Sequence, residues 1–176
     1  MPSPRAAAHA HPLVVVLCTG NAARSVMAGA LLEGAEVDVR VLTAGTHVIE
    51  HQPMSVRTRA ALAGIGIEPP HHRSRQLTEA ALADATLVVA MAAEHVRFVR
   101  RRHPAAAAKT ATISWLVQHL PPGPSPLAER VAALGLGDVG AEEQGDVEDP
   151  AGGPDEAYAR CAAELQVLVA QLVTKL

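Results

Sequence analysis

An apolar run followed at once by a short polar loop constrains this chain more than any other stretch of its 176 residues. The run, Leu13 to Leu17, is continuous and rich in valine, which is typical of a parallel strand covered on both faces. The loop reads Cys18-Thr19-Gly20-Asn21-Ala22-Ala23-Arg24-Ser25, and from Ser25 apolar residues recur at helical spacing up to Gly34. A strand, a tight loop and a helix in this order predict an α/β fold.

The spacing of Cys18 and Arg24 suits the binding of a tetrahedral anion. Five residues between them allow the backbone to curl with its N–H groups pointing inward. Gly20 and Asn21 tolerate the positive φ that such a curl needs, and the start of the helix adds unpaired donors aimed at the same point. The expected phosphate-binding residues are Thr19, Gly20, Asn21, Ala22, Ala23, Arg24 and Ser25.

Cys18, at the base of this loop, is the expected nucleophile. The positive end of the helix and the Arg24 guanidinium favour its thiolate form. The guanidinium also matches two oxygens of a phosphate group, and Ser25 is placed to donate a hydrogen bond to the sulfur. These residue types indicate attack on phosphorus and a phosphocysteine intermediate.

The loop resembles that of the low-molecular-weight protein-tyrosine phosphatases, in which C-x-G-N-x-C-R-S follows an N-terminal strand. Two positions differ, because Ala23 replaces the family's second cysteine and Val26 replaces its proline. Without that cysteine, an oxidised Cys18 lacks the family's customary resolving thiol. The resemblance implies a phosphomonoester hydrolase that needs no metal or other cofactor. Its substrate would be a phosphorylated protein, most directly one that carries phosphotyrosine, or a small phosphomonoester.

Three later segments match the family in order. Thr43, in Thr43-Ala44-Gly45-Thr46, corresponds to the start of a turn that braces the phosphate loop, and His72 corresponds to a histidine that hydrogen-bonds toward it. The Asp149-Pro150 pair corresponds to the general acid, which protonates the leaving oxygen and then activates water. The resemblance therefore implies Cys18, Arg24 and Asp149 as catalytic residues, supported by Ser25, Thr43 and His72. Asp146 is the alternative acid.

The substrate class and two other functions stay open. Ala22 and Ala151 stand where bulky residues usually wall a phosphotyrosine cleft, and the related protein-arginine phosphatases have threonine at the position of Ala22. A degenerate module that binds phosphate or a phosphoprotein without turnover is one alternative. An arsenate reductase-type redox enzyme is the other, but Cys161 is expected in the core rather than beside the loop.

The complete pattern predicts a three-layer α/β fold. Its centre is a twisted four-stranded parallel sheet with helices on both faces, and the phosphate loop follows the first strand at the carboxyl edge. The expected strands are residues 13–17, 37–43, 84–91 and 109–113, and the expected helices are 25–34, 53–63, 94–103, 127–134 and 155–176. The sequence does not show whether the insertion over 115–144 faces the active site.

Composition and length indicate the number of domains, the partners and the cellular compartment to expect. Residues 1–12 suggest a disordered leader and 13–176 a single domain. A net charge of −3 favours neither nucleic acid nor a membrane as a partner, and no apolar run approaches the ~20 residues that span a bilayer. Two cysteines far apart suit a reducing cytoplasm. Heavy use of alanine, proline and arginine suggests a bacterial source, and the oligomeric state stays open.

Overall fold

Four parallel strands form the single sheet of the computed structural model, which describes residues 11–176. Their order is β2-β1-β3-β4, and their bounds are β1 Leu13–Cys18, β2 Arg40–Gly45, β3 Leu87–Ala90 and β4 Thr110–Thr112. Most of the expected leader lies outside the described residues. Pro12 already belongs to the fold, because the Arg40 N–H donates to its carbonyl at 2.8 Å.

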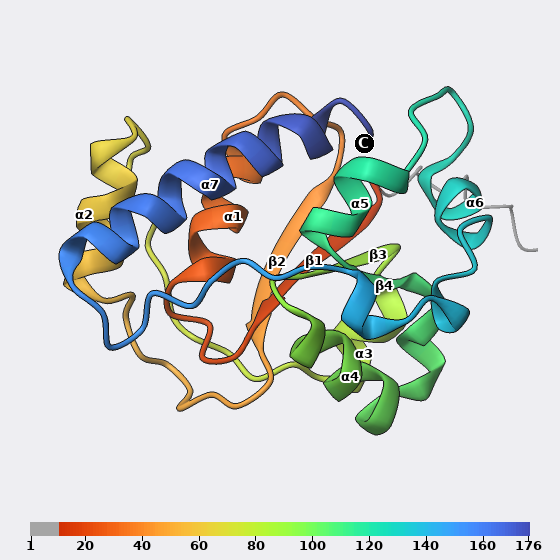
Figure 1. Ribbon diagram of the computed structural model, residues 1–176, viewed down its shortest axis with the longest axis horizontal. Helices are drawn as coiled ribbons and strands as arrows, with labels where there is room; N and C mark the ends of the chain where they lie inside the picture. Colours follow the sequence, from red (N-terminus) through yellow and green to blue (C-terminus); the bar gives the residue numbers. More distant parts are fainter. Residues whose placement is uncertain (1–10) are drawn as a thin grey trace, which may run out of the picture.

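Helices cover both faces of the sheet, which confirms the predicted three layers (Figure 1). One face carries α1 Arg24–Glu33, α2 Val56–Gly64, α5 Ile113–His119 and α7 Asp155–Val173; the other carries α3 Glu79–Asp84 and α4 Ala93–Arg102. Side chains of β1 alternate between the two layers: Val14 and Val16 face the first, and Val15 and Leu17 face the second. All four are fully buried, so β1 anchors both cores.

Several boundaries differ from the prediction. Strand β2 begins at residue 40 rather than 37 and continues to Gly45, because it pairs with β1 as far as Cys18. Helix α2 begins at Val56 rather than at Pro53, since the Ser55 hydroxyl accepts the Thr58 N–H and caps the helix there.

The short helix α3 was missed by the sequence analysis, which assigned residues 84–91 to one strand with its lead-in. The Thr78 hydroxyl accepts the Ala81 N–H at 3.2 Å and starts this helix. The strand itself is limited to the four residues of β3. A helix of less than two turns has too few residues to show a clear helical period, and one capping residue is a weak signal by itself.

The insertion over 115–144 packs against the C-terminal end of the chain with its first part and against α4 with its last part. It contains α6 Leu127–Ala132 and the 3₁₀ turns Leu136–Asp138 and Ala141–Glu143; another 3₁₀ turn, Pro104–Lys109, precedes β4. The buried Arg130 donates to the carbonyls of Ser125, Pro121, Lys175 and Leu176. These bonds join α6 to the end of α7.

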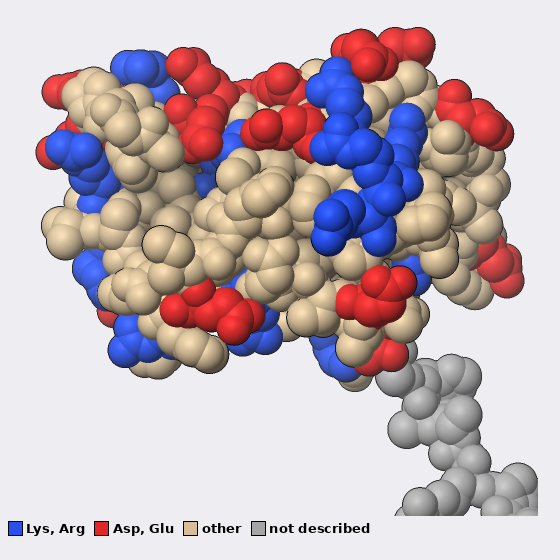
Figure 2. Space-filling model, turned by 90° about the horizontal axis from the view of Figure 1, so that it is seen from below, with Lys and Arg blue, Asp and Glu red and all other residues tan. Residues whose placement is uncertain are grey.

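Basic side chains gather in a strip on the face that α3 and α4 cover (Figure 2). Two arginines of α4 make contacts within the fold: Arg100 donates to the carbonyls of Leu136 and Val139, and Arg97 pairs with Glu142. Among the described residues, no helix has both the length and the apolar character needed to cross a bilayer.

Candidate active site

The loop that joins β1 to α1 presents a row of free backbone donors at the carboxyl edge of the sheet. The N–H groups of Gly20 through Ser25 donate to no oxygen of residues 11–176. Asn21 has a φ of 51°, in the left-handed region that a curled loop requires. Asn21, Arg24 and Ser25 are buried, although buried backbone donors are normally paired. A tetrahedral anion is the chemical group that such a nest accepts.

The Cys18 sulfur, which is almost fully buried, lies at the base of the loop. The Cys18 Sγ is 3.0 Å from the Ser25 Oγ. The Asn21 Nδ2 donates to the same Ser25 Oγ at 2.9 Å. Because Asn21 fills an acceptor position of this hydroxyl, the Ser25 proton is free to point at the sulfur. This arrangement stabilises a thiolate.

The segment at residues 72–75 holds Asn21 in its left-handed conformation. The Arg75 N–H donates to the Asn21 Oδ1 at 2.9 Å, and the His72 Nε2 lies 2.7 Å from the Asn21 carbonyl oxygen. Burial lowers the pKa of His72, so the ring is neutral at pH 7 with its one proton on Nε2. The Thr58 hydroxyl donates to the Ala22 carbonyl at 2.9 Å and supports the next residue of the loop.

The turn after β2 also braces the loop, but through its backbone. The Thr46 N–H donates to the Cys18 carbonyl and the His47 N–H to the Thr19 carbonyl, each at 3.0 Å. The Thr43 hydroxyl makes no hydrogen bond within residues 11–176, so its expected bracing role does not go through that group. Thr43 packs on α1 instead: a Cβ at Gly29 would lie 2.3 Å from the Thr43 methyl carbon.

Replacing Gly45 with alanine is expected to displace the phosphate loop. The new Cβ would lie 2.5 Å from the Thr19 carbonyl oxygen and 3.0 Å from the Asn21 nitrogen, and backbone atoms cannot rotate away. We expect a loss of about 1–3 kcal/mol in the free energy of unfolding, together with a lower kcat/KM. Urea unfolding and steady-state kinetics measure both. Gly64→Ala is the control, since its Cβ meets no atom within 4 Å; equal losses in both variants would contradict the prediction.

Arg24 and Asp149 meet at the mouth of the loop. The Arg24 Nη2 donates to the Asp149 Oδ2 at 2.9 Å, and its Nη1 donates to the Val147 carbonyl at 3.1 Å. The guanidinium is buried, whereas the Asp149 side chain is 45% exposed and can meet a substrate. Asp146 serves a different purpose, because its Oδ1 accepts the Ala93 N–H at 2.7 Å at the start of α4. The geometry therefore brings Asp149, rather than Asp146, to Arg24.

His95, in the first turn of α4, was missed by the sequence analysis. Its side chain is 1% exposed, and its Nδ1 accepts the Ala92 N–H at 3.1 Å. Burial and the positive charge of Arg24 lower the pKa of His95 to about 4, so its one proton lies on Nε2. That Nε2 donates to the Thr19 hydroxyl at 2.9 Å. A lone histidine in a surface-helix pattern carries no signal that distinguishes it from a solvated residue.

Acid is expected to destabilise the protein through His95. Its pKa is about 4 in the fold against 6.5 unfolded, so the unfolded chain binds more protons between these values. Stability is therefore lost as the pH falls from 6.5 toward 4, by about 3 kcal/mol in total. The lowered pKa of His72 acts in the same direction. Urea unfolding of the wild type and His95→Gln across this range tests the prediction, and equal slopes against pH would refute it.

Cys161 lies on the core side of α7, as the sequence analysis expected. Its thiol is buried, and this burial raises the pKa of Cys161 to about 12. Both cysteines of the chain are free thiols. A thiol that stays protonated at neutral pH is a poor partner for disulfide exchange.

Comparisons with known proteins agree with this geometry. Residues 13–122 match the family model described as low molecular weight phosphotyrosine protein phosphatase. A protein-arginine-phosphatase of Geobacillus stearothermophilus is 34% identical over 93% of this chain and 95% of its own length. The low molecular weight protein-tyrosine-phosphatase Etp of Escherichia coli K12 is 31% identical over 63% of this chain and 76% of its own.

Solved structures extend the similarity to the fold. The YwlE arginine phosphatase from G. stearothermophilus superposes with a TM-score of 0.76 at 33% identity, covering 93% of this chain and 92% of that one. A low molecular weight protein tyrosine phosphatase from T. tengcongensis gives 0.74 at 32% identity, covering 94% and 99%. The chain therefore belongs to the low molecular weight phosphotyrosine protein phosphatase family of cysteine-dependent enzymes, which confirms the family expected from its motifs.

Proposed function

We propose that this phosphatase hydrolyses phosphorylated side chains of proteins, with Cys18 as nucleophile, Arg24 as anion-binding residue and Asp149 as general acid and base. The observation that carries the proposal is the convergence of three groups on one loop. The N–H groups of the loop that follows Cys18 have no acceptor among the described residues, Arg24 ends this loop, and the Asp149 carboxylate lies 2.9 Å from the Arg24 guanidinium.

The first step transfers the phosphoryl group to sulfur. The Cys18 thiolate attacks phosphorus, the bond from phosphorus to the leaving group breaks, and Asp149 gives its proton to the departing atom. Arg24 and the loop N–H groups bind the nonbridging oxygens and stabilise the charge that develops on them. A positioned acid of this kind contributes typically about 10²–10⁴-fold.

The second step returns the enzyme to its starting state. Asp149, now ionised, removes a proton from water, the water oxygen attacks phosphorus, and the S–P bond breaks. The Ser25 hydroxyl, 3.0 Å from the sulfur, stabilises the thiolate that leaves. Inorganic phosphate is the product.

Rapid-quench kinetics with para-nitrophenyl phosphate test the mechanism. We expect a burst of para-nitrophenol equal to the enzyme concentration and a phosphoenzyme that an alkaline quench traps in the wild type, and we expect no burst from Cys18→Ser. A protein that binds phosphate or vanadate but shows neither burst nor turnover would instead be a binding module, and the proposal would fail.

Family membership supports phosphotyrosine as the substrate, and phosphoarginine is a second candidate. The full-length relative is named an arginine phosphatase, and a second carboxylate lies at the mouth: the exposed Glu94 Oε1 is 3.4 Å from the Thr19 hydroxyl. Carboxylates favour a guanidinium over a phenol ring. Ala22 and Ala151 stand at the two positions where bulky residues usually wall a phosphotyrosine cleft.

The two substrates are distinguished by kcat/KM on matched phosphotyrosine and phosphoarginine peptides. If Glu94 pairs with a guanidinium, Glu94→Gln lowers kcat/KM for the phosphoarginine peptide and leaves that for phosphotyrosine unchanged. Equal effects on both peptides would remove the reason for the second candidate. The mechanism needs a reduced Cys18, so we place the enzyme in the reducing cytoplasm.

A further inference from the structure

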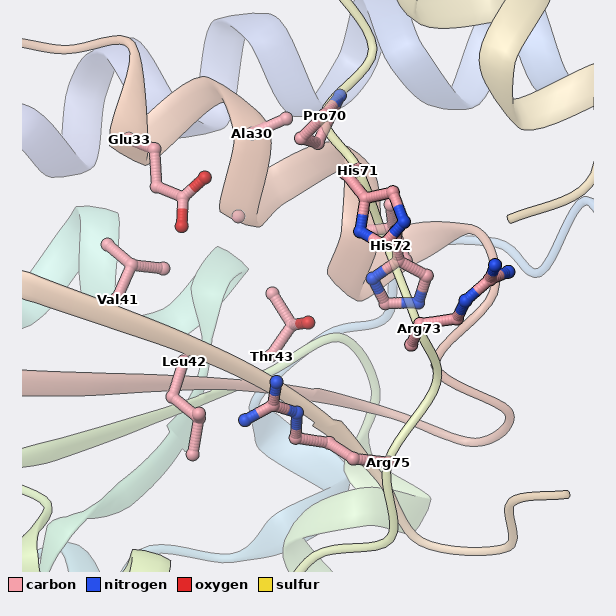
Figure 3. A pocket seen from close by; sticks show the side chains of 12 residues that line it. Ala30, Glu33, Val41, Leu42, Thr43, Pro70, His71, His72, Arg73 and Arg75 are labelled. Atoms are coloured by element: carbon pink, nitrogen blue, oxygen red, sulfur yellow. The ribbon is translucent and has the colours of Figure 1, made fainter. Parts of the chain in front are cut away.

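A cavity of about 130 Å³ lies at the outer edge of β2 (Figure 3). Its walls come from α1, from β2 and from the segment at residues 70–75. Neither Cys18, Arg24 nor Asp149 lines it, so it is separate from the phosphate loop. None of the proposed catalytic steps uses it.

Charges of opposite sign reach this cavity from different walls. Glu33 extends from the end of α1, and Arg75 extends from the 70–75 segment beside Leu42 and Thr43 (Figure 3). Arg73 also lines the cavity, but its guanidinium points away from Glu33 and Arg75 (Figure 3). Neither the Glu33 nor the Arg75 side chain makes an ion pair or hydrogen bond within residues 11–176. A ligand with one kind of charge would pair with one of them and be repelled by the other. A ligand with both kinds of charge would pair with both.

The edge of β2 adds backbone donors and acceptors to the same cavity. The Arg40 N–H points toward β1, because it donates to Pro12. Alternation along the strand then directs the N–H and C=O groups of Val41 and Thr43 outward, as it does for Gly45. The outward groups of Gly45 pair with Arg75 and Leu77, whereas those of Val41 and Thr43 have no backbone partner among the described residues. An open strand edge of this kind binds other backbone groups.

We propose that this cavity binds a free α-amino acid. Its ammonium group is placed against the Glu33 carboxylate and the outward carbonyls of β2, and its carboxylate against the Arg75 guanidinium and the outward N–H groups. The volume admits a ligand of amino-acid size, and Ala30, Val41 and Pro70 offer apolar contact for a small side chain.

The site lies next to the support of the phosphate loop. Arg75, whose side chain lines the cavity, donates its N–H to the Asn21 side chain, and His72 bonds the Asn21 carbonyl. An amino acid bound there contacts the segment that holds Asn21. The reaction itself requires neither the cavity nor its ligand.

Thermal denaturation of the full chain with each common L-amino acid tests the proposal. At about ten times its Kd, a ligand of the native state is expected to raise the Tm by about 3 °C or more. Calorimetric titration then compares the strongest ligand with its N-acetyl derivative, which lacks the positive charge, and its carboxamide, which lacks the negative charge. Each is expected to bind at least about tenfold more weakly.

Variants locate the site. Glu33→Gln and Arg75→Gln are each expected to weaken binding at least about tenfold, whereas Glu36→Gln and Arg59→Gln, exposed residues outside the cavity, leave it unchanged. Saturating inorganic phosphate, which occupies the loop, is expected not to compete. The proposal is overturned if no amino acid binds, if the singly charged derivatives bind equally well, if the controls lose affinity as much, or if phosphate displaces the ligand competitively.

Discussion

Replacing Cys18 with serine is expected to lower kcat by at least about 10⁴-fold. The serine oxygen fits the base of the loop, but an alcohol lacks the nucleophilicity of a thiolate, and no described residue beside it is a general base that would activate it: Ser25, 3.0 Å from the sulfur, is itself an alcohol. The measurement is single-turnover and steady-state hydrolysis of para-nitrophenyl phosphate. Because the loop donors stay in place, phosphate and vanadate binding are expected to persist.

Cys161→Ala is the matched control for this prediction. Cys161 is the other free thiol, and it lies buried on α7 where it packs the core. Its removal is expected to lower stability modestly and to leave kcat unchanged. If Cys161→Ala lost turnover as Cys18→Ser does, the two thiols would act together and the redox alternative would replace the phosphatase mechanism. If Cys18→Ser kept turnover, Cys18 would not be the nucleophile.

The part of the site that could be predicted from sequence is the part encoded locally. Cys18, Arg24 and the residues between them lie on one strand, one loop and one helix start, and each of these elements has its own pattern. The order of strands and helices was likewise sufficient for a parallel sheet, because crossover connections restrict the topology. Asp149 lies far away in sequence, and its position followed from the family resemblance alone.

Two supports of the loop, Thr58 and His95, could not be predicted, because nothing near them in sequence points to the loop. They reach it only after α2 and α4 have packed on the sheet. His72 and the turn after β2 were implied by the family resemblance, but their hydrogen-bond partners were not. Gly45 shows the difference clearly. In sequence it is one of 13 glycines, and only the 2.5 Å distance from its Cβ position to the Thr19 oxygen reveals the constraint.

Replacing Asp149 with asparagine is expected to lower activity in a way that depends on the leaving group. Asparagine has the same shape and still accepts a hydrogen bond from Arg24, so the loop keeps its geometry, but it cannot supply a proton. For a phosphotyrosine peptide we expect kcat to fall about 10²–10⁴-fold. For para-nitrophenyl phosphate, whose leaving group needs little protonation, we expect a much smaller loss. Parallel kinetics on the two substrates measure the ratio.

Asp146→Asn tests whether Asp146, rather than Asp149, is the general acid. Asp146 accepts the Ala93 N–H at 2.7 Å. Asparagine keeps this acceptor but removes the negative charge at the start of α4, so we expect a loss of only about 0.3–1 kcal/mol in the free energy of unfolding. The two substrates should then lose activity equally, because the proton donor is intact. A leaving-group dependence in Asp146→Asn and none in Asp149→Asn would move the acid to Asp146. Dependence in neither variant would mean that the leaving group departs without a proton from either carboxylate.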